Sequence, residues 1–281
     1  MRKVGVVGLG TMGAGIAQVC IQAGVETVGR EVTAELGAQA RERIDHYLSR
    51  GVEKGRLTAT EKAAALGRLR TTTELLELAE CDLVVEAIVE DLDAKRALLR
   101  ELDRIVAANA VLTTNTSALP VTEIARATER PERVVGMHFF NPAPVLPLVE
   151  VVQTELASED AVETVIAFAE RVGKKPIRCG DTPGFVVNRV LIPLLNDCVG
   201  VLDEAGVTPQ DLDTAMTSGL NWPIGPCALI DLIGVDVHVH ASEALHRALG
   251  ESRMAPPPRL LRMRKDGALG RKAGRGFFTY D

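Results

Sequence analysis

Short β-branched apolar runs alternate with longer helical patterns through the first part of the chain. The runs that predict strands cover residues 4–7, 26–28, 83–87, 111–114, 134–138, 148–152 and 175–179. One long interval, residues 32–69, is rich in Ala, Arg and Glu, and it predicts two inserted helices. Alternation of this kind is typical of a parallel, doubly wound sheet that helices cover on both faces.

The pattern changes to mainly helical beyond residue 182. Apolar residues at 187, 190, 191, 194, 195, 198, 202 and 205 follow helical spacing over several turns. Thr208-Pro209-Gln210-Asp211 then offers an N-cap, a proline at the first helical position and an acid at the third. Only residues 276–280 still suggest a strand. We therefore expect two domains, an α/β domain over residues 1–182 and an all-α domain over residues 183–281.

Composition and charge exclude several classes of protein. The 281 residues carry 32 Lys and Arg against 38 Asp and Glu, and only 3% are aromatic, which argues against nucleic-acid binding. Five cysteines without a C-x-x-C pair argue against a disulfide scaffold or a zinc site and favour a reducing compartment. No signal peptide precedes the first predicted strand, and no apolar run reaches the ~20 residues of a membrane span. We expect a cytoplasmic protein that does not enter a membrane.

A glycine-rich turn directly follows the first predicted strand and opens an apolar helix. Its sequence, Gly8-Leu9-Gly10-Thr11-Met12-Gly13, fits G-x-G-x-x-G, in which the glycines allow a tight turn and close approach to a pyrophosphate. The pyrophosphate would bind the helix N-terminus, where N–H groups and the helix dipole favour anions. Glu31 stands near the position, about 20 residues on, of the acid that binds a ribose hydroxyl. The sequence predicts a dinucleotide-binding Rossmann-type domain; the alternative is a turn that merely packs helix on strand.

Two neighbouring residues bear on the choice of dinucleotide. Glu31 at the fingerprint position favours NAD, because its charge repels a 2′-phosphate. Arg30 precedes it, and arginine near this position accommodates that phosphate, so NADP stays open.

Candidate catalytic groups follow later strands. His138 ends a predicted strand before a proline-rich loop, where ligands bind in doubly wound sheets, although a lone histidine is more often a core residue. Glu150 interrupts an apolar strand, and an imidazole would be a suitable partner that raises the basicity of a general base. Alternatively, Glu150 points to solvent. Ser117 either binds a substrate oxygen or caps the next helix.

Several further motifs occur in order along the whole chain. They are Val85-Glu86-Ala87-Ile88-Val89-Glu90, Asn115-Thr116-Ser117, His138-Phe139-Phe140-Asn141-Pro142, Pro183-Gly184-Phe185-Val186-Val187-Asn188-Arg189, Gly225-Pro226, Asp231-Leu232-Ile233-Gly234 and Gly274-Arg275-Gly276-Phe277-Phe278. With the glycine-rich turn, they resemble the L-3-hydroxyacyl-CoA dehydrogenase family, in particular its single-function 3-hydroxybutyryl-CoA dehydrogenase branch.

The resemblance implies roles for individual residues. His138 matches the family's catalytic histidine and Glu150 the carboxylate paired with it, while Ser117 and Asn188 match residues that contact the substrate's oxygens. Besides the glycine-rich turn and Glu31, the implied cofactor contacts are Glu90, Lys95, Asn141, Ser117 and Lys272. Glu90, Lys95 and Asn141 match positions near the nicotinamide, and Lys272 matches a more peripheral one.

The resemblance also implies a CoA contact. Lys54, in the inserted helical pair, matches a lysine that meets the CoA moiety. Two positions depart from the family pattern. Tyr47 stands where members often have a serine, and Gly29-Arg30-Glu31 stands where they usually have an apolar or aromatic pair followed by Asp.

The implied reaction is reversible oxidation of a 3-hydroxyacyl-CoA, short-chain in this branch, to the 3-oxoacyl-CoA. His138 would remove the hydroxyl proton while hydride leaves C3 for the nicotinamide, so no metal is expected. One alternative is a dehydrogenase of the same scaffold that acts on a carrier-protein thioester or on a sugar acid. Lys54 argues against the sugar acid, which has no CoA phosphates for a lysine to bind. Another alternative is a non-catalytic, crystallin-like scaffold that binds a dinucleotide. The presence together of four site residues argues against it: His138, Glu150, Ser117 and Asn188. Chain length, direction and pathway stay open.

The resemblance further places the active site in the cleft between the two domains. The helix predicted from residue 187 carries a broad apolar arc that Val199 and Val201 widen beyond one packing stripe. A small helical domain would leave part of that surface exposed, which is typical of an interface. We therefore expect a homodimer.

Overall fold

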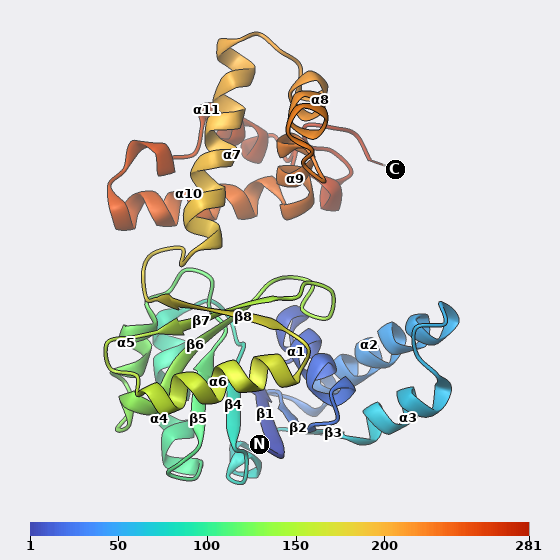
Figure 1. Cartoon of the computed structure of the whole chain (residues 1–281), viewed down its shortest axis with the longest axis vertical. Coiled ribbons are helices and arrows are strands. Elements are labelled where there is room, and N and C mark those ends of the chain that lie inside the picture. Colours follow the sequence, from blue (N-terminus) through green and yellow to red (C-terminus); the bar gives the residue numbers. More distant parts are fainter. Residues whose placement is uncertain (281) are drawn as a thin grey trace. The chain divides into compact units, whose positions relative to one another are not determined.

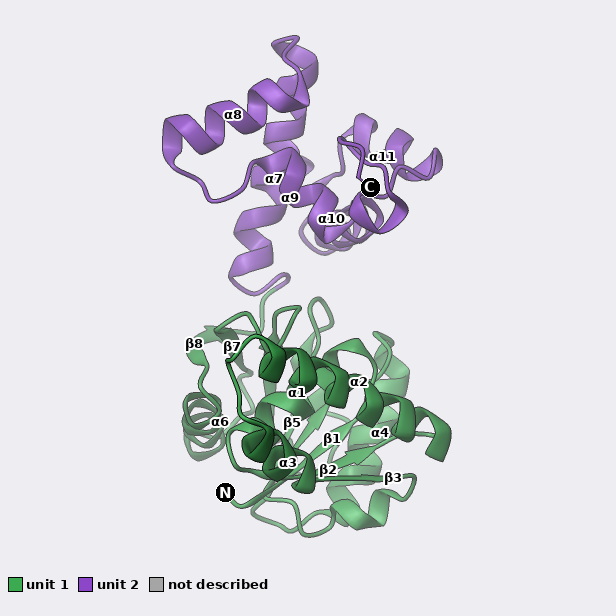
Figure 2. Cartoon of the chain, turned by 90° about the vertical axis from the view of Figure 1, so that its right-hand side faces the viewer, with its two compact units in different colours: residues 1–182 green, residues 183–281 purple. Residues whose placement is uncertain are grey.

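A computed structural model describes residues 1–280 of the chain. It divides into two compact units, unit 1 from Met1 to Thr182 and unit 2 from Pro183 onward (Figure 2). Each unit is described below by itself.

Unit 1 is built on an eight-stranded sheet in the order β3-β2-β1-β4-β5-β6-β7-β8 (Figure 1). β4, β5 and β6 are buried at every position because helices cover both faces, and most of their residues are accordingly apolar. The strands are β1 (Lys3–Val7), β2 (Glu26–Arg30), β3 (Leu69–Thr72), β4 (Leu83–Glu86), β5 (Val111–Thr114), β6 (Val134–Phe139), β7 (Leu148–Gln153) and β8 (Lys175–Gly180).

Helices pack on both faces of this sheet and form two apolar cores. One core joins the sheet to α1 (Thr11–Gln22), α2 (Ala34–Glu53), α3 (Ala59–Gly67) and α6 (Glu159–Arg171). The other joins it to η1 (Leu75–Leu78), α4 (Leu92–Ile105) and α5 (Val121–Ala125). A short helix, η2 (Pro131–Arg133), precedes β6. The prediction of a doubly wound α/β sheet with an inserted helical pair is confirmed.

Three predictions about strands are wrong. The sheet is mixed, because β6 and β7 pair antiparallel; the short connection between them has no room for the crossover that parallel strands require. β3 was not among the predicted strands: only its first residue, Leu69, falls in the predicted helical interval, and as a short edge strand it offers no other apolar signal. Residues 276–280 form no strand, only the isolated bridge Arg275↔Thr279. The amides of Phe277 and Phe278 instead donate hydrogen bonds to the Asp231 carboxylate.

Unit 2 is helical, as predicted. Thr208 and Asp211 form a capping box at the start of one helix, so the predicted N-terminus at that motif is confirmed. The helices are α7 (Val187–Glu204), α8 (Pro209–Leu220), α9 (Pro226–Ile233), α10 (Val235–Leu249), η3 (Ser252–Met254), α11 (Pro258–Lys265) and η4 (Arg271–Ala273).

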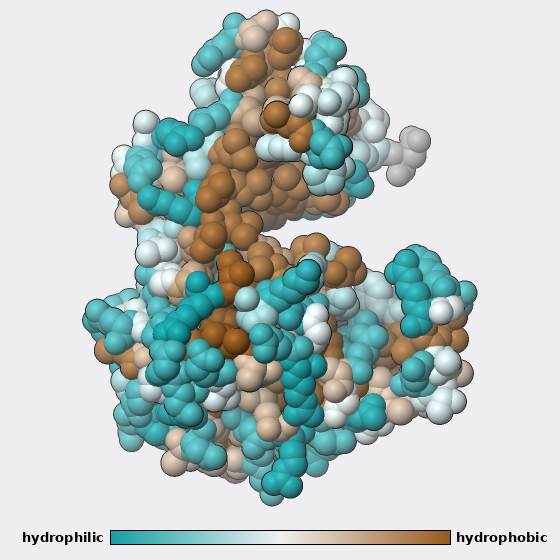
Figure 3. All heavy atoms as spheres, viewed as in Figure 1, coloured by the Kyte–Doolittle hydropathy of each residue, from teal (hydrophilic) through white to brown (hydrophobic). Residues whose placement is uncertain are grey.

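Hydrophobic side chains gather on the surface of unit 2 along α7 (Figure 3). Val190 is 62% exposed and Val201 is 41% exposed on that helix. Val199 is 0% exposed and packs in a core of unit 2, so the prediction that it widens the exposed apolar arc is wrong. Within residues 1–280, no helix combines the length and apolar character that crossing a membrane requires. In the same range, no three His, Cys, Asp or Glu side chains are grouped as metal ligands would be.

Candidate active site

The glycine-rich turn between β1 and α1 has the geometry that a pyrophosphate needs. Gly8 has φ +84°, and a Cβ on Gly13 would lie 1.7 Å from the Gly8 carbonyl oxygen, so both positions require glycine. A Cβ on Gly10 would meet nothing within 4 Å, which leaves the space over the turn open. The described part of the chain supplies no side-chain cap to α1, so its first-turn N–H groups are suited to an anion.

Glu31 lies beside this turn, directly after β2. Its Oε1 accepts a hydrogen bond from the Leu9 amide at 2.6 Å, and its Oε2 accepts one from the Val32 amide at 3.0 Å. Arg30 is held differently, because its Nε donates to the Thr73 carbonyl at 3.1 Å. The carboxylate is thus fixed next to the loop that would hold the pyrophosphate.

His138 and Glu150 form a buried pair across two antiparallel strands. They are register partners in β6 and β7, and His138 Nδ1 lies 2.7 Å from Glu150 Oε2. Glu150 is 0% exposed and His138 is 6% exposed, so the alternative that Glu150 points to solvent is wrong. With Nδ1–H donating to the carboxylate, the lone pair of the neutral ring is on Nε2, the tautomer that a general base needs.

Ser117 follows β5 and is exposed. Its amide donates to Glu90 Oε1 at 2.9 Å, and α5 begins only at Val121, after Pro120, without a side-chain cap. The alternative that Ser117 caps the next helix is therefore wrong. Asn115, which was not among the predicted site residues, fixes the end of the neighbouring strand β6, because its Oδ1 accepts a hydrogen bond from the Phe139 amide at 2.9 Å. Its place directly after an apolar strand was the available signal.

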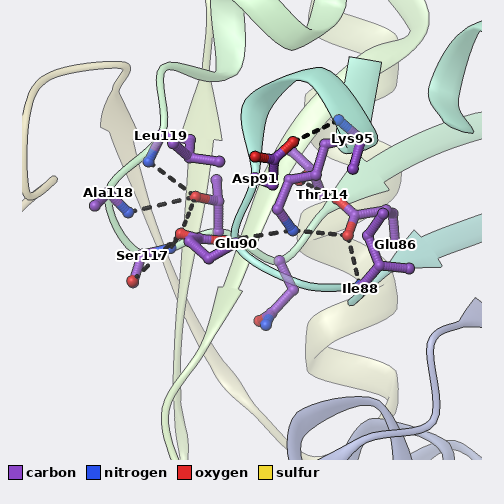
Figure 4. Close-up of polar contacts among 12 residues, drawn as sticks. Glu86, Ile88, Glu90, Asp91, Lys95, Thr114, Ser117, Ala118 and Leu119 are labelled. Carbon is purple, nitrogen blue, oxygen red and sulfur yellow. Dashed lines mark hydrogen bonds and ion pairs between the residues drawn. The ribbon is translucent and has the colours of Figure 1, made fainter. Parts of the chain in front are cut away.

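Glu90 and Lys95 belong to a polar cluster that also contains Glu86 (Figure 4). Lys95 is 0% exposed, and its Nζ lies 2.7 Å from Glu86 Oε1 and 3.4 Å from Glu90 Oε2. Desolvation by burial raises the pKa of Glu86, although Lys95, Thr114 and the Ile88 amide act in the opposite direction. Sequence reasoning missed Glu86, although an acid at the end of an apolar strand was its signal.

A cavity of about 680 Å³ lies within unit 1, beside α1 and α2. Thr11 and Asn141 line it, and so does Lys54, which follows α2 and is exposed. The remaining cationic side chains of its lining are those of Arg43, Arg50 and Arg56. The structure therefore brings predicted cofactor and CoA contacts to one concave, cationic surface.

The loop between β6 and β7 forms part of that cavity wall, and a buried lysine holds it through hydrogen bonds. Lys174 Nζ donates to the carbonyls of Ala143 at 2.5 Å and Leu146 at 2.9 Å. Burial lowers the pKa of Lys174. These bonds fix the segment that carries Asn141.

Two predicted site residues lie in unit 2. Asn188 is the second residue of α7 and is half-buried. Lys272 lies in η4, is exposed, and its Nζ lies 2.7 Å from the Asp236 carboxylate. Their relation to the groups of unit 1 stays a prediction.

Comparison with known proteins identifies the family of this constellation. Residues 3–182 match the model of the 3-hydroxyacyl-CoA dehydrogenase NAD binding domain, and residues 184–280 match that of the family's C-terminal domain. The chain belongs to the 3-hydroxyacyl-CoA dehydrogenase family. As a member of this family it is an NAD-binding oxidoreductase that acts on CH–OH groups of 3-hydroxyacyl-CoA, so the predicted family and activity are confirmed.

Individual members of the family resemble the chain over its full length. A 3-hydroxybutyryl-CoA dehydrogenase of Mycobacterium tuberculosis is 45% identical, with 100% of this chain and 99% of the relative covered. The human mitochondrial hydroxyacyl-coenzyme A dehydrogenase is 37% identical, with 100% and 91% covered. The crystal structure of the (S)-3-hydroxybutyryl-CoA dehydrogenase PaaH1 from Ralstonia eutropha matches with a TM-score of 0.96 at 38% identity, covering 100% of this chain and 99% of that one.

Proposed function

We propose that this protein interconverts short-chain 3-hydroxyacyl-CoA, 3-hydroxybutyryl-CoA in particular, and the 3-oxoacyl-CoA. The buried His138–Glu150 pair carries the proposal, because it supplies a general base near the end of β6, in the same sheet whose first strand leads into the glycine-rich turn. The short chain length is supported by relatives named 3-hydroxybutyryl-CoA dehydrogenase at 45% and 38% identity.

In the proposed mechanism, His138 Nε2 takes the proton of the substrate's 3-hydroxyl. Glu150 accepts the Nδ1–H bond and stabilises the imidazolium as it forms. Ser117 and Asn188 bind the substrate's oxygens and orient C3. The nicotinamide, when bound, supplies the hydride acceptor. Residues 8–13, Glu31, Asn141, Glu90, Lys95 and Lys272 would hold the cofactor.

For the cofactor we propose NAD(H) rather than NADP(H). The Leu9 amide holds the Glu31 carboxylate in place. There the carboxylate would accept a hydrogen bond from a ribose hydroxyl, and its charge would repel a 2′-phosphate. Arg30, the residue that favours NADP, has its Nε engaged by the Thr73 carbonyl. The test compares kcat/KM with NADH and NADPH in the wild type and in Glu31→Ala. Wild type should prefer NADH and the variant should lose that preference; a wild type already faster with NADPH would overturn the proposal.

For the acyl carrier we propose CoA rather than a carrier protein or a sugar acid. CoA carries phosphates, which suit the lysine and three arginines of the cavity, whereas a sugar acid has none. The experiment follows NADH consumption with acetoacetyl-CoA, an acetoacetyl carrier-protein thioester and free acetoacetate, and then with 3-oxoacyl-CoA of increasing chain length. Acetoacetyl-CoA should give the highest kcat/KM, and a preference for either competitor would contradict the proposal.

A matched pair of variants tests the cavity. Lys54→Ala should raise the KM for acetoacetyl-CoA, since it removes a cation from the lining. Lys62→Ala removes a lysine of α3 that pairs with Asp45 and is not part of that lining, so it should leave this KM unchanged.

We also propose that the protein is a homodimer of the cytoplasm. The exposed Val190 and Val201 on α7 support an interface on unit 2. Five free cysteines support a reducing compartment. Sedimentation should give a dimer mass, and a monomer mass that does not change with concentration would refute the assembly.

A further inference from the structure

Glu86 is a buried carboxylate that the proposed mechanism does not use. It ends β4 and is 0% exposed. Its Oε1 lies 2.7 Å from Lys95 Nζ and accepts the Ile88 amide at 2.7 Å, while its Oε2 accepts the Thr114 hydroxyl at 2.6 Å. Both oxygens are therefore fixed by groups from β5, α4 and the loop after β4.

Lys95 transmits this anchoring to a second carboxylate. A fully buried ammonium is costly unless anions compensate it, and Glu86 and Glu90 are the carboxylates that pair with it. The closer contact is with Glu86, at 2.7 Å against 3.4 Å to Glu90 Oε2. Glu86 thus determines where the ammonium lies between the two acids.

Glu90 in turn holds the segment after β5. Its Oε1 accepts the Thr116 hydroxyl at 2.6 Å and the Ser117 amide at 2.9 Å. Figure 4 shows the resulting series of contacts, which runs from Glu86 through Lys95 and Glu90 to Ser117. It connects the end of β4 to the segment after β5 through three side chains and the Ser117 amide.

We propose that Glu86 is a positioning residue, which acts through Lys95 and Glu90 to hold Ser117 where it binds substrate. The proposal rests on the substrate-binding role proposed for Ser117. Without the charge of Glu86, the ammonium moves toward Glu90, its remaining anion. Glu90 then reorients toward the ammonium, and its bond to the Ser117 amide weakens.

The direct test is amide hydrogen exchange of Ser117 in the full chain, compared between wild type and Glu86→Gln. Glutamine keeps the size and an acceptor oxygen but removes the charge. Weakening one hydrogen bond of about 1 kcal/mol should speed exchange by roughly fivefold to tenfold. Unchanged exchange in Glu86→Gln overturns the proposal. If that variant does not fold, Lys95→Met interrupts the same series of contacts and should have the same effect.

Thr113→Val is the matched control. Thr113 lies next to Thr114 in β5, and its buried hydroxyl donates to the Val84 carbonyl at 3.1 Å, outside the series. Its loss should leave Ser117 exchange as in wild type. Equal acceleration in this control would mean that any weakening of the strand frees Ser117, and it would also overturn the proposal.

Kinetics separate this proposal from the proposed function. Glu86→Gln should lower kcat/KM for acetoacetyl-CoA by about the same fivefold to tenfold in wild type, and by less than twofold in Ser117→Ala, because residues joined in one network of hydrogen bonds and ion pairs couple. Equal losses in both backgrounds would overturn the positioning role while leaving the reaction intact. A wild type inactive on every 3-oxoacyl-CoA would instead overturn the proposed function, and the exchange result would still decide whether Glu86 positions Ser117.

Discussion

Neutralising Glu150 is the perturbation that bears most specifically on the buried pair. In Glu150→Gln, the amide oxygen can still accept the Nδ1–H bond, so the tautomer of His138 is kept while the charge is lost. The charges of an imidazolium and a carboxylate are each spread over several atoms, so their centres lie ~4 Å apart in a hydrogen-bonded pair. At an effective dielectric of about 20, two charges at that separation attract by roughly 4 kcal/mol. Because ~1.4 kcal/mol is a factor of ten, the loss of imidazolium stabilisation is bounded at about 10³-fold in kcat. With partial compensation by the retained hydrogen bond, we expect a decrease of about 10–10³-fold.

The assay is steady-state NADH oxidation with saturating acetoacetyl-CoA, together with NADH binding by fluorescence. NADH affinity should not change, because the glycine-rich turn and Glu31 are untouched. Asp103→Asn is a matched control, because it also neutralises a buried carboxylate that is held in an ion pair, here with Arg130. Asp103 lies near the C-terminus of α4, which leads to the amino end of β5, whereas the proposed site lies at the carboxyl ends of the strands. It should lower stability and leave kcat unchanged. A Glu150→Gln enzyme with kcat within twofold of wild type would show that the Glu150 charge does not stabilise the imidazolium.

Two further predictions concern the stability of unit 2. Burial lowers the pKa of His238 from 6.5 to about 4, so the unfolded state takes up a proton first as pH falls, and stability is lost between these values. The loss should total about 3 kcal/mol by urea unfolding and be absent in His238→Gln; an equal loss in the variant would contradict the assignment. Asp231→Ala leaves the Phe277 and Phe278 amides and the Tyr280 hydroxyl without their acceptor, and should cost about 2–4 kcal/mol. A cost below ~0.5 kcal/mol would show that the carboxylate does not anchor the C-terminal segment.

Elements with a strong local signal could be predicted from the sequence. β5 is specified by a short run rich in β-branched residues, and the turn around Gly8 by glycines whose Cβ would clash. The N-terminus of α8 is specified by the capping residues Thr208 and Asp211. β3 could not be predicted, because an edge strand with one buried apolar residue owes its existence to pairing with β2.

The candidate site shows the same limit. The contact between His138 and Glu150 could be anticipated, because each is a polar interruption of an apolar strand. Glu86 was missed since its importance depends on Lys95 and Thr114, which are distant from it in sequence or on other elements. The antiparallel pairing that brings His138 opposite Glu150 was also not predicted, because the alternation of strands and helices suggested parallel strands throughout.

The role of His138 as the general base of this 3-hydroxyacyl-CoA dehydrogenase can be tested with the variant His138→Gln. The measurement is kcat for NADH oxidation with acetoacetyl-CoA, accompanied by thermal unfolding and NADH affinity. We expect kcat to fall by about 10²–10⁴, the usual contribution of general acid–base catalysis, while the fold and NADH binding are retained. Near-wild-type kcat in a folded His138→Gln enzyme that binds NADH would contradict this role.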